Sequence, residues 1–597
     1  MTMPTTATGV GEPTDLVVVG GGMAGVMAAL AAKTPENRVL VVEPSNVLGG
    51  QGTVGGVAGF CGDTARVNAP FAELVARLAA HQLIEPYRPN DDRRPYDLEW
   101  CAFFLQEMAL VRGIEVLLHA RVVGARAAAG VVQELTVCTA GGLVTLAPRF
   151  VIDASGACTV PLLAGFPVVH EGANRQLPMS LYFTMWETGR KVAPILPEGC
   201  PRWTNDDEIP MTSLHRFPSG KVEVKMKVVG FDAADGRGRS EAEMFARRQM
   251  HGLIHYLQTV GYRGRKLDTH VLASVSRGIG VREERRIIGE HVLTEGEARR
   301  AVIFPDAVAV NTYHIDFHWP DRMERAGTGI TDMLDPHHLP LRMMIPRGAK
   351  NLLVPGRGAS GDQTAMSAFR VMAVVAQMGF AAGHAARQCL ETGTDLSNIA
   401  VPRLQATIEA GGQSLNLSDY GEYLRCDLFS HEPVFDRDEL SRSPRDLRLV
   451  RQRDGCFIVA WREGDAVVSA ERREKRWAAV PPASMPDGTG AASEVALAEG
   501  MLARVSTSTG RLLVRIATVG GSVTATEREL APEVNARVAP VVAATRTGLA
   551  IVYVDGPGQL MFWHGSIERI VDGPPVASSV RLNSPPEHVA EPHSLTA

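Results

Sequence analysis

Short apolar runs alternate with Ala-rich helical stretches over the first quarter of the chain. Residues 16–19, 39–42, 116–118 and 150–152 have the length and apolar character of buried strands, and the first of them leads into a predicted helix at 26–33. Strands that alternate with helices are typical of βαβ units, in which neighbouring strands pair in parallel. The pattern therefore predicts an α/β fold built on a parallel sheet.

The pattern changes twice further along the chain. Residues 181–186 and 221–229 are typical of strands and 240–260 of a helix, whereas a buried strand at 351–355 precedes helical Ala/Met periodicity over 364–390. After residue 446, strand candidates at 457–461, 512–516 and 549–554 are separated by Gly, Asp and Pro turns. These changes predict an inserted domain of mixed character and a C-terminal all-β domain.

Composition narrows the class of protein. A chain of 597 residues is too long for one ordinary core, and 45% hydrophobic with 21% charged residues is typical of soluble globular proteins. The net charge of −5, with both signs interspersed, offers no basic stripe for nucleic acid. No apolar run approaches the roughly 18 residues of a membrane span, and no secretory signal begins the chain. We expect no nucleic-acid partner, no membrane span and a cytoplasmic location.

The cysteines give no sign of a metal centre. None forms a C-x-x-C pair or a cluster with histidine, which argues against zinc and iron-sulfur sites. The eight are Cys61, Cys101, Cys138, Cys158, Cys200, Cys389, Cys426 and Cys456. We expect reduced thiols and no bound metal.

The turn after the first strand carries a dinucleotide fingerprint. Gly20, Gly22 and Gly25 fit the pattern G-x-G-x-x-G between a strand and a helix. They permit a tight turn, a close approach of the backbone to pyrophosphate and close packing of helix on strand. Glu43 ends the second strand at the spacing of a carboxylate that binds an adenosine ribose. The segment predicts a dinucleotide site but leaves FAD and NAD open.

The residues after Glu43 resemble the FAD-dependent oxidoreductases of the glutathione-reductase-like superfamily. There a paired glycine follows the ribose acid, as Gly49-Gly50 does here in the run to Thr53. Residues 113–123 are similar to the segment whose valine backbone meets the adenine, which implies Val122. Residues 150–156 resemble the A-T-G motif with Ala154 and Gly156, although serine stands at position 155. The resemblance implies that the cofactor is FAD.

Two later segments extend the resemblance. Residues 351–357, with Gly356, and the helical stretch after residue 364 are similar to the strand and helix that reach the flavin. Residues 280–290 resemble the G-x-R-E-x-R-R-I-x-G signature of a broad FAD-dependent oxidoreductase family related to fumarate-reductase and succinate-dehydrogenase flavoproteins. The likeness covers about residues 15–413, excluding parts of the middle. We interpret Glu283-Glu284 with the neighbouring arginines as ion-paired support on a helix.

The predicted fold class is thus α/β, with a Rossmann-like FAD-binding domain, an inserted mixed α+β substrate domain and a C-terminal all-β domain. The expected boundaries are a flexible N-terminus at 1–13, the FAD-binding domain at 14–173 and 276–425, the substrate domain at 174–275, the β domain at 446–582 and a tail at 583–597. The helix of the second FAD-binding part is expected to cap the flavin.

Candidate residues at the reacting end of the flavin are fewer. A helix that begins near residues 364–367 would direct N–H groups and a positive dipole end at the flavin N1 and O2. Gly356, Arg370 and Met372 are the candidates beside the ring, although Arg370 is equally compatible with a helix surface.

For the proton, the best constellation is His314, Asp316 and His318. On a strand these three would share one face, an arrangement suited to an oriented imidazole base, and the resemblance implies a D-x-H element here. His337 and His338 are a second candidate pair, for which a polar loop is the alternative. Cys61 lacks a resolving partner, which favours a packing thiol, with covalent flavin attachment left open.

Together these features predict an enzyme, a dehydrogenase or oxidase that transfers hydride from a small polar or ring-shaped organic substrate to flavin N5. Its partners would be that substrate and an electron acceptor, oxygen or another carrier, with a homo-oligomer left open. The alternatives are a flavin-dependent reductase of activated double bonds, a flavin monooxygenase, and a scaffold or binding protein with a vestigial flavin fold. A monooxygenase would need a nicotinamide site, and the sequence has a single dinucleotide fingerprint.

Overall fold

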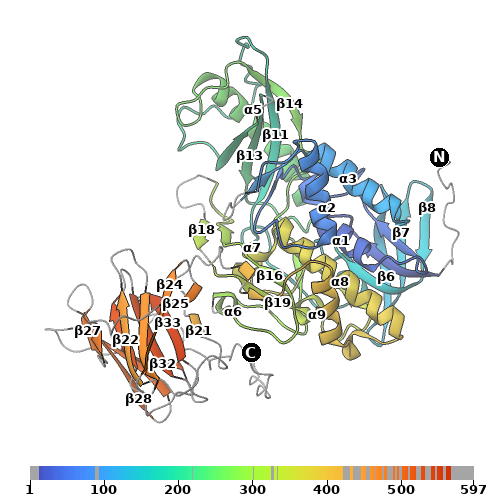
Figure 1. The fold of residues 1–597 in the computed structure, drawn as a ribbon. Helices are drawn as coiled ribbons and strands as arrows, with labels where there is room; N and C mark the ends of the chain where they lie inside the picture. The colour runs from blue at the N-terminus through green and yellow to red at the C-terminus, as the bar shows by residue number, and fades with distance from the viewer. Residues whose placement is uncertain are drawn as a thin grey trace. The chain divides into compact units, whose positions relative to one another are not determined.

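The computed structural model describes residues 13–87, 93–217, 220–299, 301–323, 329–332, 334–417 and 419–420, and strands between residues 430 and 566. By its internal contacts the chain divides into two units, Met1–Tyr423 and Leu424–Ala597. Their elements are drawn in Figure 1. The tails expected at 1–13 and 583–597 lie outside the described residues, apart from Pro13.

A five-stranded parallel sheet forms the centre of the first unit. Its order is β20 (Leu352–Leu353), β9 (Pro148–Asp153), β1 (Thr14–Val19), β2 (Val39–Val42) and β5 (Glu115–Leu117). Val18 lies opposite Val41 on one side and Ile152 on the other. Every residue of β2 is buried, as expected for a parallel sheet that is covered on both faces. The predicted parallel sheet is confirmed.

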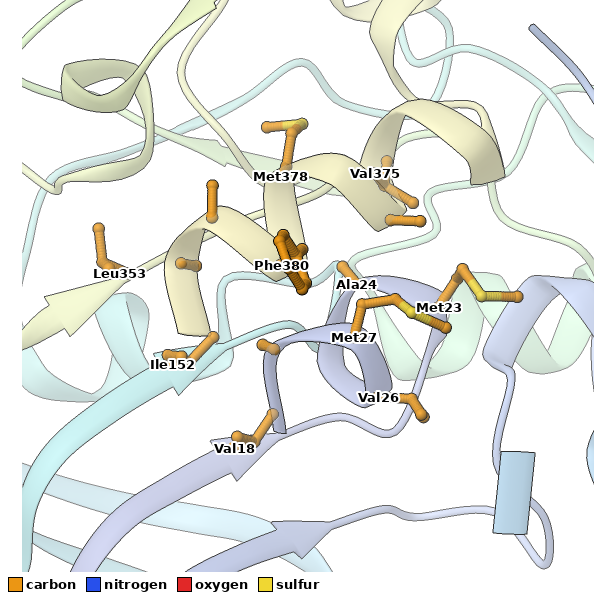
Figure 2. Packing of buried hydrophobic residues seen from close by; sticks show 14 of the residues in the cluster. Val18, Met23, Ala24, Val26, Met27, Ile152, Leu353, Val375, Met378 and Phe380 are labelled. Atoms are coloured by element: carbon orange, nitrogen blue, oxygen red, sulfur yellow. The ribbon is translucent and has the colours of Figure 1, made fainter. Parts of the chain in front are cut away.

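Two helices pack on one face of this sheet, α1 (Met23–Ala32) and α8 (Met372–Thr392). Figure 2 shows Met27 of α1 and Phe380 of α8 side by side above Val18 and Ile152. The helices approach at Gly379 and Gly383 of α8, where an added Cβ would overlap the carbonyl oxygens of Ala24 and Ala28 of α1. Only glycine at these positions permits so close an approach of the two backbones.

Further elements of the first unit surround this core. They are η1 (Gly50–Gly52), β3 (Gly59–Phe60), α2 (Ala69–Ala80), β4 (Arg94–Pro95), α3 (Leu98–Val111), α4 (Thr159–Ala164), η3 (Leu396–Asn398), α9 (Val401–Ala410) and the antiparallel sheet β6 (Arg121–Ala128), β7 (Val131–Thr139) and β8 (Gly142–Leu146). The sheet β6-β7-β8 packs against β9 through Val132, Leu135 and Val137, which belong to the same core cluster.

A second sheet lies in the middle of the sequence, ordered β12 (Thr212–Arg216), β13 (Lys221–Val228), β11 (Met179–Glu187) and β14 (His270–Val275). Helix α5 (Gly236–Thr259) packs on one face of it, as Figure 1 shows, with Leu181, Val224 and Met226 in the shared core. Residues of the opposite parity, among them Tyr182, Glu223 and Lys225, form the other face. The strand and helix candidates of this region coincide with β11, β13 and α5.

Short elements connect this sheet to the last helices of the first unit. They are β10 (Val168–His170) paired with β15 (Arg285–Ile287), α6 (Glu295–Arg299), β16 (Ala307–Asn311) paired with β19 (His337–Pro340), β17 (Ile315–His318) paired with β18 (Gly329–Asp332), η2 (Leu341–Met344) and α7 (Gln363–Phe369).

The helix predicted around Glu283-Glu284 is wrong. Arg285 and Arg286 belong to strand β15, and Glu283 precedes it outside any helix. Glu283 is buried and accepts from Arg286, from the backbone N–H of Leu177 at 2.7 Å and from Gln363 at 2.6 Å. The spacing of Glu283 and Arg286 fits an i,i+3 contact on a helix as well as the loop and strand that the structure has. The charge pattern therefore indicated a helix that is not there. The ion pair between Glu283 and Arg286 nevertheless exists, within a loop and strand.

The helix predicted over residues 364–390 is two helices. It breaks after α7 because Val371 takes an extended conformation, and α8 begins at Met372 with a bend of 92° between the helices. Within the described part of the chain, no single helix is long and apolar enough to cross a membrane. The bent pair α7 and α8 passes that test only when its two helices are taken together.

The second unit consists of antiparallel strands. These are β21 (Ser430–Pro433), β22 (Arg445–Arg451), β23 (Phe457–Glu463), β24 (Ala466–Arg473), β25 (Arg476–Val480), β26 (Thr489–Gly490), β27 (Glu494–Ala496), β28 (Met501–Ser508), β29 (Arg511–Thr518), β30 (Thr526–Ala531), β31 (Val541–Ala544), β32 (Gly548–Val554) and β33 (Leu560–Ser566). Their sheets are ordered β21-β33-β32-β31, β25-β24-β23-β22-β26 and β27-β28-β29-β30. The strand candidates at 457–461, 512–516 and 549–554 lie in β23, β29 and β32.

Candidate active site

An elongated cavity of about 500 Å³ lies in the first unit at the carboxyl ends of β1 and β2. Its wall runs from Gly20, Gly22 and Glu43 to Arg370 and Met372. The carboxyl ends of strands in an open parallel sheet are where such folds bind nucleotides. The cavity therefore joins the predicted adenosine end to the predicted flavin end.

The glycine-rich turn forms one end of the cavity. Gly20 takes a φ of 96°, and a Cβ there would lie 2.7 Å from the carbonyl oxygen of Ala154. A Cβ at Gly22 would meet no protein atom closer than Gly50 Cα at 4.0 Å, so it would occupy the cavity instead. Gly25 is not on the wall, because a Cβ there would overlap the carbonyl oxygen of Gly20. Gly25 thus serves the packing of helix on strand.

The N-termini of α1 and α8 border the cavity and lack a side-chain cap. Gly22 is the N-cap of α1 and Val371 that of α8, and neither provides a side-chain hydrogen bond. Helices α2, α3, α5 and α7, by contrast, are capped by Asn68, Asp97, Asp235 and Asp362. Free N–H groups and a positive dipole end suit a phosphate at α1 and an anionic ring edge at α8. The first turn of α8 borders the cavity, whereas none of residues 364–367 does.

Glu43 is buried at the end of β2. Its Oε2 accepts from the backbone N–H of Gly21 at 2.6 Å, and its Oε1 accepts from the backbone N–H and hydroxyl of Ser45 at 2.8 and 2.5 Å. These bonds hold the carboxylate on the cavity wall, next to the glycine-rich turn. A carboxylate in this position accepts hydrogen bonds from ribose hydroxyls.

The paired glycine brings a second loop against the first. Gly49 takes a φ of 105° and Gly50 a φ of 56°, and a Cβ at Gly50 would lie 2.9 Å from Gly22 Cα. The Gly49 N–H donates to the carbonyl oxygen of Gly21 at 2.7 Å. Thr53 lies behind the wall, where its hydroxyl donates to the carbonyl oxygen of Leu48 at 2.7 Å. Gly50 borders the cavity, whereas Thr53 supports the loop.

The turn after β9 forms the adjoining wall with Ala154, Ser155 and Gly156. Asp153 is fully buried and accepts from the N–H groups of Ser155 and Val160 at 2.9 and 2.7 Å, which fixes the turn. Val122, at the start of β6, also lines the cavity. Ser155 keeps the hydroxyl of the threonine that it replaces in the motif.

At the far end the wall consists of Gly356, Arg357, Arg370 and Met372. Arg357 donates to the carbonyl oxygens of Gly156 at 2.8 Å and Val281 at 2.6 Å. The Nε of Arg370 is buried and has no hydrogen-bond partner in the described part of the chain. An orphaned donor on a cavity wall fits a polar ring edge as its missing partner.

Asp316 joins the cavity wall to the predicted histidine. Its Oδ2 accepts from Arg370 Nη2 at 2.7 Å, and its Oδ1 lies 3.0 Å from His318 Nε2. Both residues lie in β17, and their spacing places them on one face, as predicted. His318 is buried, and none of the described residues forms a hydrogen bond with its Nδ1.

Burial and charge set the protonation of this pair. Burial alone would raise the pKa of Asp316, but His318, Arg370 and Arg282 hold that pKa well below its usual range. Burial, aided by Arg282, lowers the pKa of His318 to about 3. Asp316 is therefore an anion that only accepts, so His318 donates through Nε2–H and presents an unprotonated Nδ1.

The other candidate histidines have different surroundings. His314 precedes β17, and its ring centroid lies 4.0 Å from that of Tyr313. His337 and His338 belong to the buried strand β19, not to a polar loop. His338 Nε2 lies 2.9 Å from the carbonyl oxygen of Leu415, and its Nδ1 accepts from the N–H of Phe304 at 3.3 Å. Both ring nitrogens of His338 thus form hydrogen bonds with backbone groups, and His338 does not line the cavity.

The cysteines in the described part of the chain are free thiols. Burial raises the pKa of Cys61, so its thiol is uncharged at neutral pH. Cys61 does not border the cavity. Cys426 and Cys456 lie outside the described residues. Within the described residues, no group of three or more His, Cys, Asp or Glu side chains could hold a metal ion.

The structure also brings in residues that sequence reasoning missed. Arg239, Glu243 and Arg277 of the middle region line the cavity. Lys225 and Arg93 lie beside the polar face of the middle sheet, where Arg93 binds Glu223 at 2.6 Å. The alternation Lys-Val-Glu-Val-Lys-Met-Lys over residues 221–227 was the available signal, because its apolar face implies an opposite face of charges.

The model of the FAD dependent oxidoreductase family matches residues 15–408. The chain belongs to this family. As an FAD dependent oxidoreductase it is an enzyme, and its cofactor is FAD. A sequence search among curated proteins found no match.

Solved structures similar to this FAD dependent oxidoreductase show low identity. A myxobacterial chondrochloren halogenase is 15% identical with a TM-score of 0.38, covering 67% of this chain and 79% of that chain. A geranylgeranyl bacteriochlorophyll reductase-like protein from Thermoplasma acidophilum is 14% identical with a TM-score of 0.36, and the match covers 69% of this chain and 88% of that chain. A p-nitrophenol 4-monooxygenase from Pseudomonas putida is 11% identical with a TM-score of 0.37, and the match covers 69% of this chain and 93% of that chain. Scores at this level do not bear on the function of this FAD dependent oxidoreductase.

The cavity of this FAD dependent oxidoreductase fits its cofactor. The open space beside Gly22, the uncapped N-termini of α1 and α8 and the orphaned Arg370 Nε have the chemistry that a pyrophosphate and a flavin ring require. Of the residues predicted to bind the cofactor, ten line the cavity: Gly20, Gly22, Glu43, Gly50, Val122, Ala154, Gly156, Gly356, Arg370 and Met372. Gly25 and Thr53 lie behind them.

Proposed function

We propose that this enzyme is a dehydrogenase or oxidase of a small organic substrate in which His318 accepts the substrate proton. The observation that carries the proposal is the contact of 3.0 Å between His318 Nε2 and Asp316 Oδ1. This contact leaves Nδ1 buried and unpartnered among the described residues. An imidazole held in one tautomer, with its second nitrogen unprotonated and without a hydrogen-bond partner among the described residues, is the arrangement of a general base.

The reaction balances with the groups present. The substrate C–H bond breaks and its electron pair leaves as hydride. The proton of the adjacent O–H or N–H passes to His318 Nδ1, and a C=O or C=N bond forms. Bound FAD supplies the two-electron acceptor, at N5. Oxygen or another carrier then removes the two electrons.

Asp316 is a positioning residue in this proposal. As an anion it fixes the His318 tautomer and stabilises the imidazolium that forms when the proton arrives. Arg370, a residue of the cavity wall, donates from Nη2 to Asp316 Oδ2 at 2.7 Å. The contacts from Arg370 to Asp316 and from Asp316 to His318 therefore connect the proposed base to the part of the cavity where the ring of the cofactor would fit.

We also propose that residues 174–275 form the substrate domain and residues 446–582 a separate β domain. Support for the first comes from α5, whose Arg239 and Glu243 border the cavity, and from the polar face of the middle sheet. Kinship with the glutathione-reductase-like superfamily and the fumarate-reductase flavoproteins is proposed on the motifs at Gly49-Gly50 and 280–290.

The test is anaerobic reduction of the bound flavin by a panel of sugars, amino acids, hydroxy acids and aromatic alcohols, followed by admission of air. We expect at least one donor to bleach the flavin. In H318Q the flavin content should be unchanged, and the reduction rate should fall by roughly 10²- to 10⁴-fold, the usual contribution of a general base. Fast recovery of the yellow colour in air identifies an oxidase, and slow recovery a dehydrogenase.

Three results would contradict the proposal. Bleaching by NADH or NADPH alone indicates a monooxygenase. Failure of every donor, with reoxidation of the chemically reduced enzyme by an enoate, indicates a reductase. Equal reduction rates for wild type and H318Q would show that His318 is not the base, although the enzyme would still be one that oxidises donors.

A further inference from the structure

The middle sheet has one apolar and one charged face. Leu181, Val224 and Met226 pack under α5, whereas Tyr182 and Lys225 lie on the other face, paired across β11 and β13. A strand places alternate residues on opposite faces, so the charged face is built into the sequence of β13. A charged sheet face that is removed from bulk water requires a compensating partner.

This face lies against the loop that follows the paired glycine. A Cβ at Gly56, in that loop, would lie 2.6 Å from Tyr182 Cβ. Arg282 Nη1 donates to Ser180 Oγ of β11 at 2.7 Å, and its neighbour Val281 lines the cavity. Neither Lys225 nor Arg282 lines the cavity itself, but Arg282 follows Val281 of the cavity wall and contacts the strand that pairs with that of Lys225.

Positive charge is in excess here. Among the described side chains, four cations, Arg93, Lys225, Arg282 and Arg370, interact with one another and with two carboxylates, Glu223 and Asp316. Arg93 pairs with Glu223 at 2.6 Å and Arg370 with Asp316 at 2.7 Å. Within this set of six side chains the excess is therefore two positive charges, those of Lys225 and Arg282.

Neither of these two cations has a described carboxylate partner. Arg282 donates to the carbonyl oxygen of Pro178 and to Ser180 Oγ, both at 2.7 Å and both neutral. No hydrogen bond or ion pair is described for Lys225. Both side chains are half-buried. A cation that is removed in part from water costs free energy unless an anion accompanies it, and each of these two raises that cost for the other.

We propose that the substrate is a small organic acid whose carboxylate binds to Lys225 and Arg282, with the carbon that is oxidised held toward His318. This inference rests on the proposed function, since it assigns a substrate class to the same site. Arg282 provides a planar guanidinium and Lys225 a point charge, a combination that holds a carboxylate in orientation.

The carboxylate of the bound acid also makes His318 a stronger base. Burial, Arg282 and Lys225 hold the pKa of His318 at about 3, too low for efficient proton acceptance at neutral pH. An anion beside Arg282 and Lys225 offsets their charge and raises the pKa of His318 in the complex. A neutral compound of the same shape leaves His318 a weak base. Selectivity for acids thus acts on the rate as well as on binding.

The test titrates the holoenzyme with lactate, benzoate and succinate and with their neutral amides, lactamide, benzamide and succinamide. Binding is followed by the absorption spectrum of the bound flavin, without turnover. We expect at least one acid to bind ten times more tightly than its amide. Overturning results are equal binding of every acid and amide, or binding of amides alone. Because no reaction is needed, this readout is independent of whether the enzyme oxidises donors.

The variant K225Q locates the site. We expect the Kd of the preferred acid to rise at least tenfold in K225Q and to be restored in K225R, with flavin content unchanged. The matched control is K191Q, because the Lys191 side chain is 85% exposed and pairs only weakly with Asp268 at 3.7 Å. Equal Kd values for wild type and K225Q overturn the assignment, even if acids are preferred. If K225Q does not fold, the comparison of acids with amides in wild type still decides the substrate class.

Discussion

Asp316 Oδ1 and His318 Nε2 lie 3.0 Å apart, while Arg370 Nη2 holds the second oxygen of Asp316 at 2.7 Å. Because Arg370 can only donate, the oxygen of an asparagine at position 316 would face Arg370 and its amide NH₂ would face His318. His318 Nε2 would then have to accept, which moves the ring proton to Nδ1. The tautomer of His318 is therefore set by the charge of Asp316.

The first prediction follows for D316N. The variant should bind FAD normally, because Asp316 does not line the cavity. Its rate of flavin reduction should fall by roughly 10²- to 10⁴-fold, as for loss of the base itself. Flavin content and anaerobic reduction rates are the measurements, with D207N at an exposed position as the control. An unchanged rate in D316N would show that the tautomer is immaterial.

The second prediction separates two glycines of one motif. In G22A the added Cβ meets no protein atom within 4.0 Å, so the apoprotein should unfold at the wild-type temperature while FAD occupancy falls. In G25A the Cβ overlaps the carbonyl oxygen of Gly20, so the apoprotein should lose about 1–3 kcal/mol or more of stability. Thermal unfolding of the apoproteins and flavin release on denaturation measure both effects. The same defect in both variants would contradict this division of roles.

The third prediction concerns the buried pair of Glu283 and Arg286. In E283Q the charge of Arg286 loses its buried partner, with Glu171 at 2.8 Å as its remaining carboxylate. Removing one member of a buried pair costs about 3–5 kcal/mol of the free energy of unfolding. Urea denaturation measures the loss, and E241Q at an exposed helix position is the control. If E283Q loses no more free energy of unfolding than E241Q, the ion pair of Glu283 and Arg286 does not contribute to stability.

The fourth prediction is a pH step in the binding of acids. Burial, with Arg282, Arg93 and Arg370, lowers the pKa of Lys225 to about 8, against the opposing effect of Asp316. The ammonium is charged below that pH, so the Kd of a carboxylate should be constant below about pH 8 and rise above it by up to tenfold per pH unit.

In the free enzyme, the other groups around Lys225 whose pKa is shifted do not titrate in that range. Burial sets the pKa of His215 at about 4, of His318 at about 3 and of Tyr182 at about 12. The measurement is the Kd of the preferred acid from pH 6 to 9. The step should disappear in K225R, since arginine stays charged throughout. A step retained in K225R belongs to another group and would remove Lys225 as its origin.

Local patterns predicted residues that line one end of the cavity. Gly20, Gly22 and Glu43 belong to one strand-turn-helix-strand unit, so their relative positions follow from local geometry. Asp316 and His318 were also predicted to share a face, because the period of a strand decides that from the sequence.

Contacts between distant segments were beyond such patterns. The approach of Arg282 and Lys225 depends on how the middle sheet packs against the glycine loop, which local periodicity does not contain. The break at Val371 was missed because Ala/Met periodicity continues across it. The charges around Glu283 fit a helix and a strand alike, and only the pairing of β15 with β10 distinguishes them.

The glycine contact between α1 and α8 has a consequence for cofactor choice. Because their backbones meet at Gly379 and Gly383, the first turns of the two helices cannot slide relative to each other without a steric clash. One of these turns borders the cavity at Gly22 and Met23 and the other at Met372 and Val375. The helix pair therefore fixes the distance between the two N-termini that border the cavity. A mononucleotide such as FMN is long enough to contact only one of these N-termini, whereas a dinucleotide contacts both.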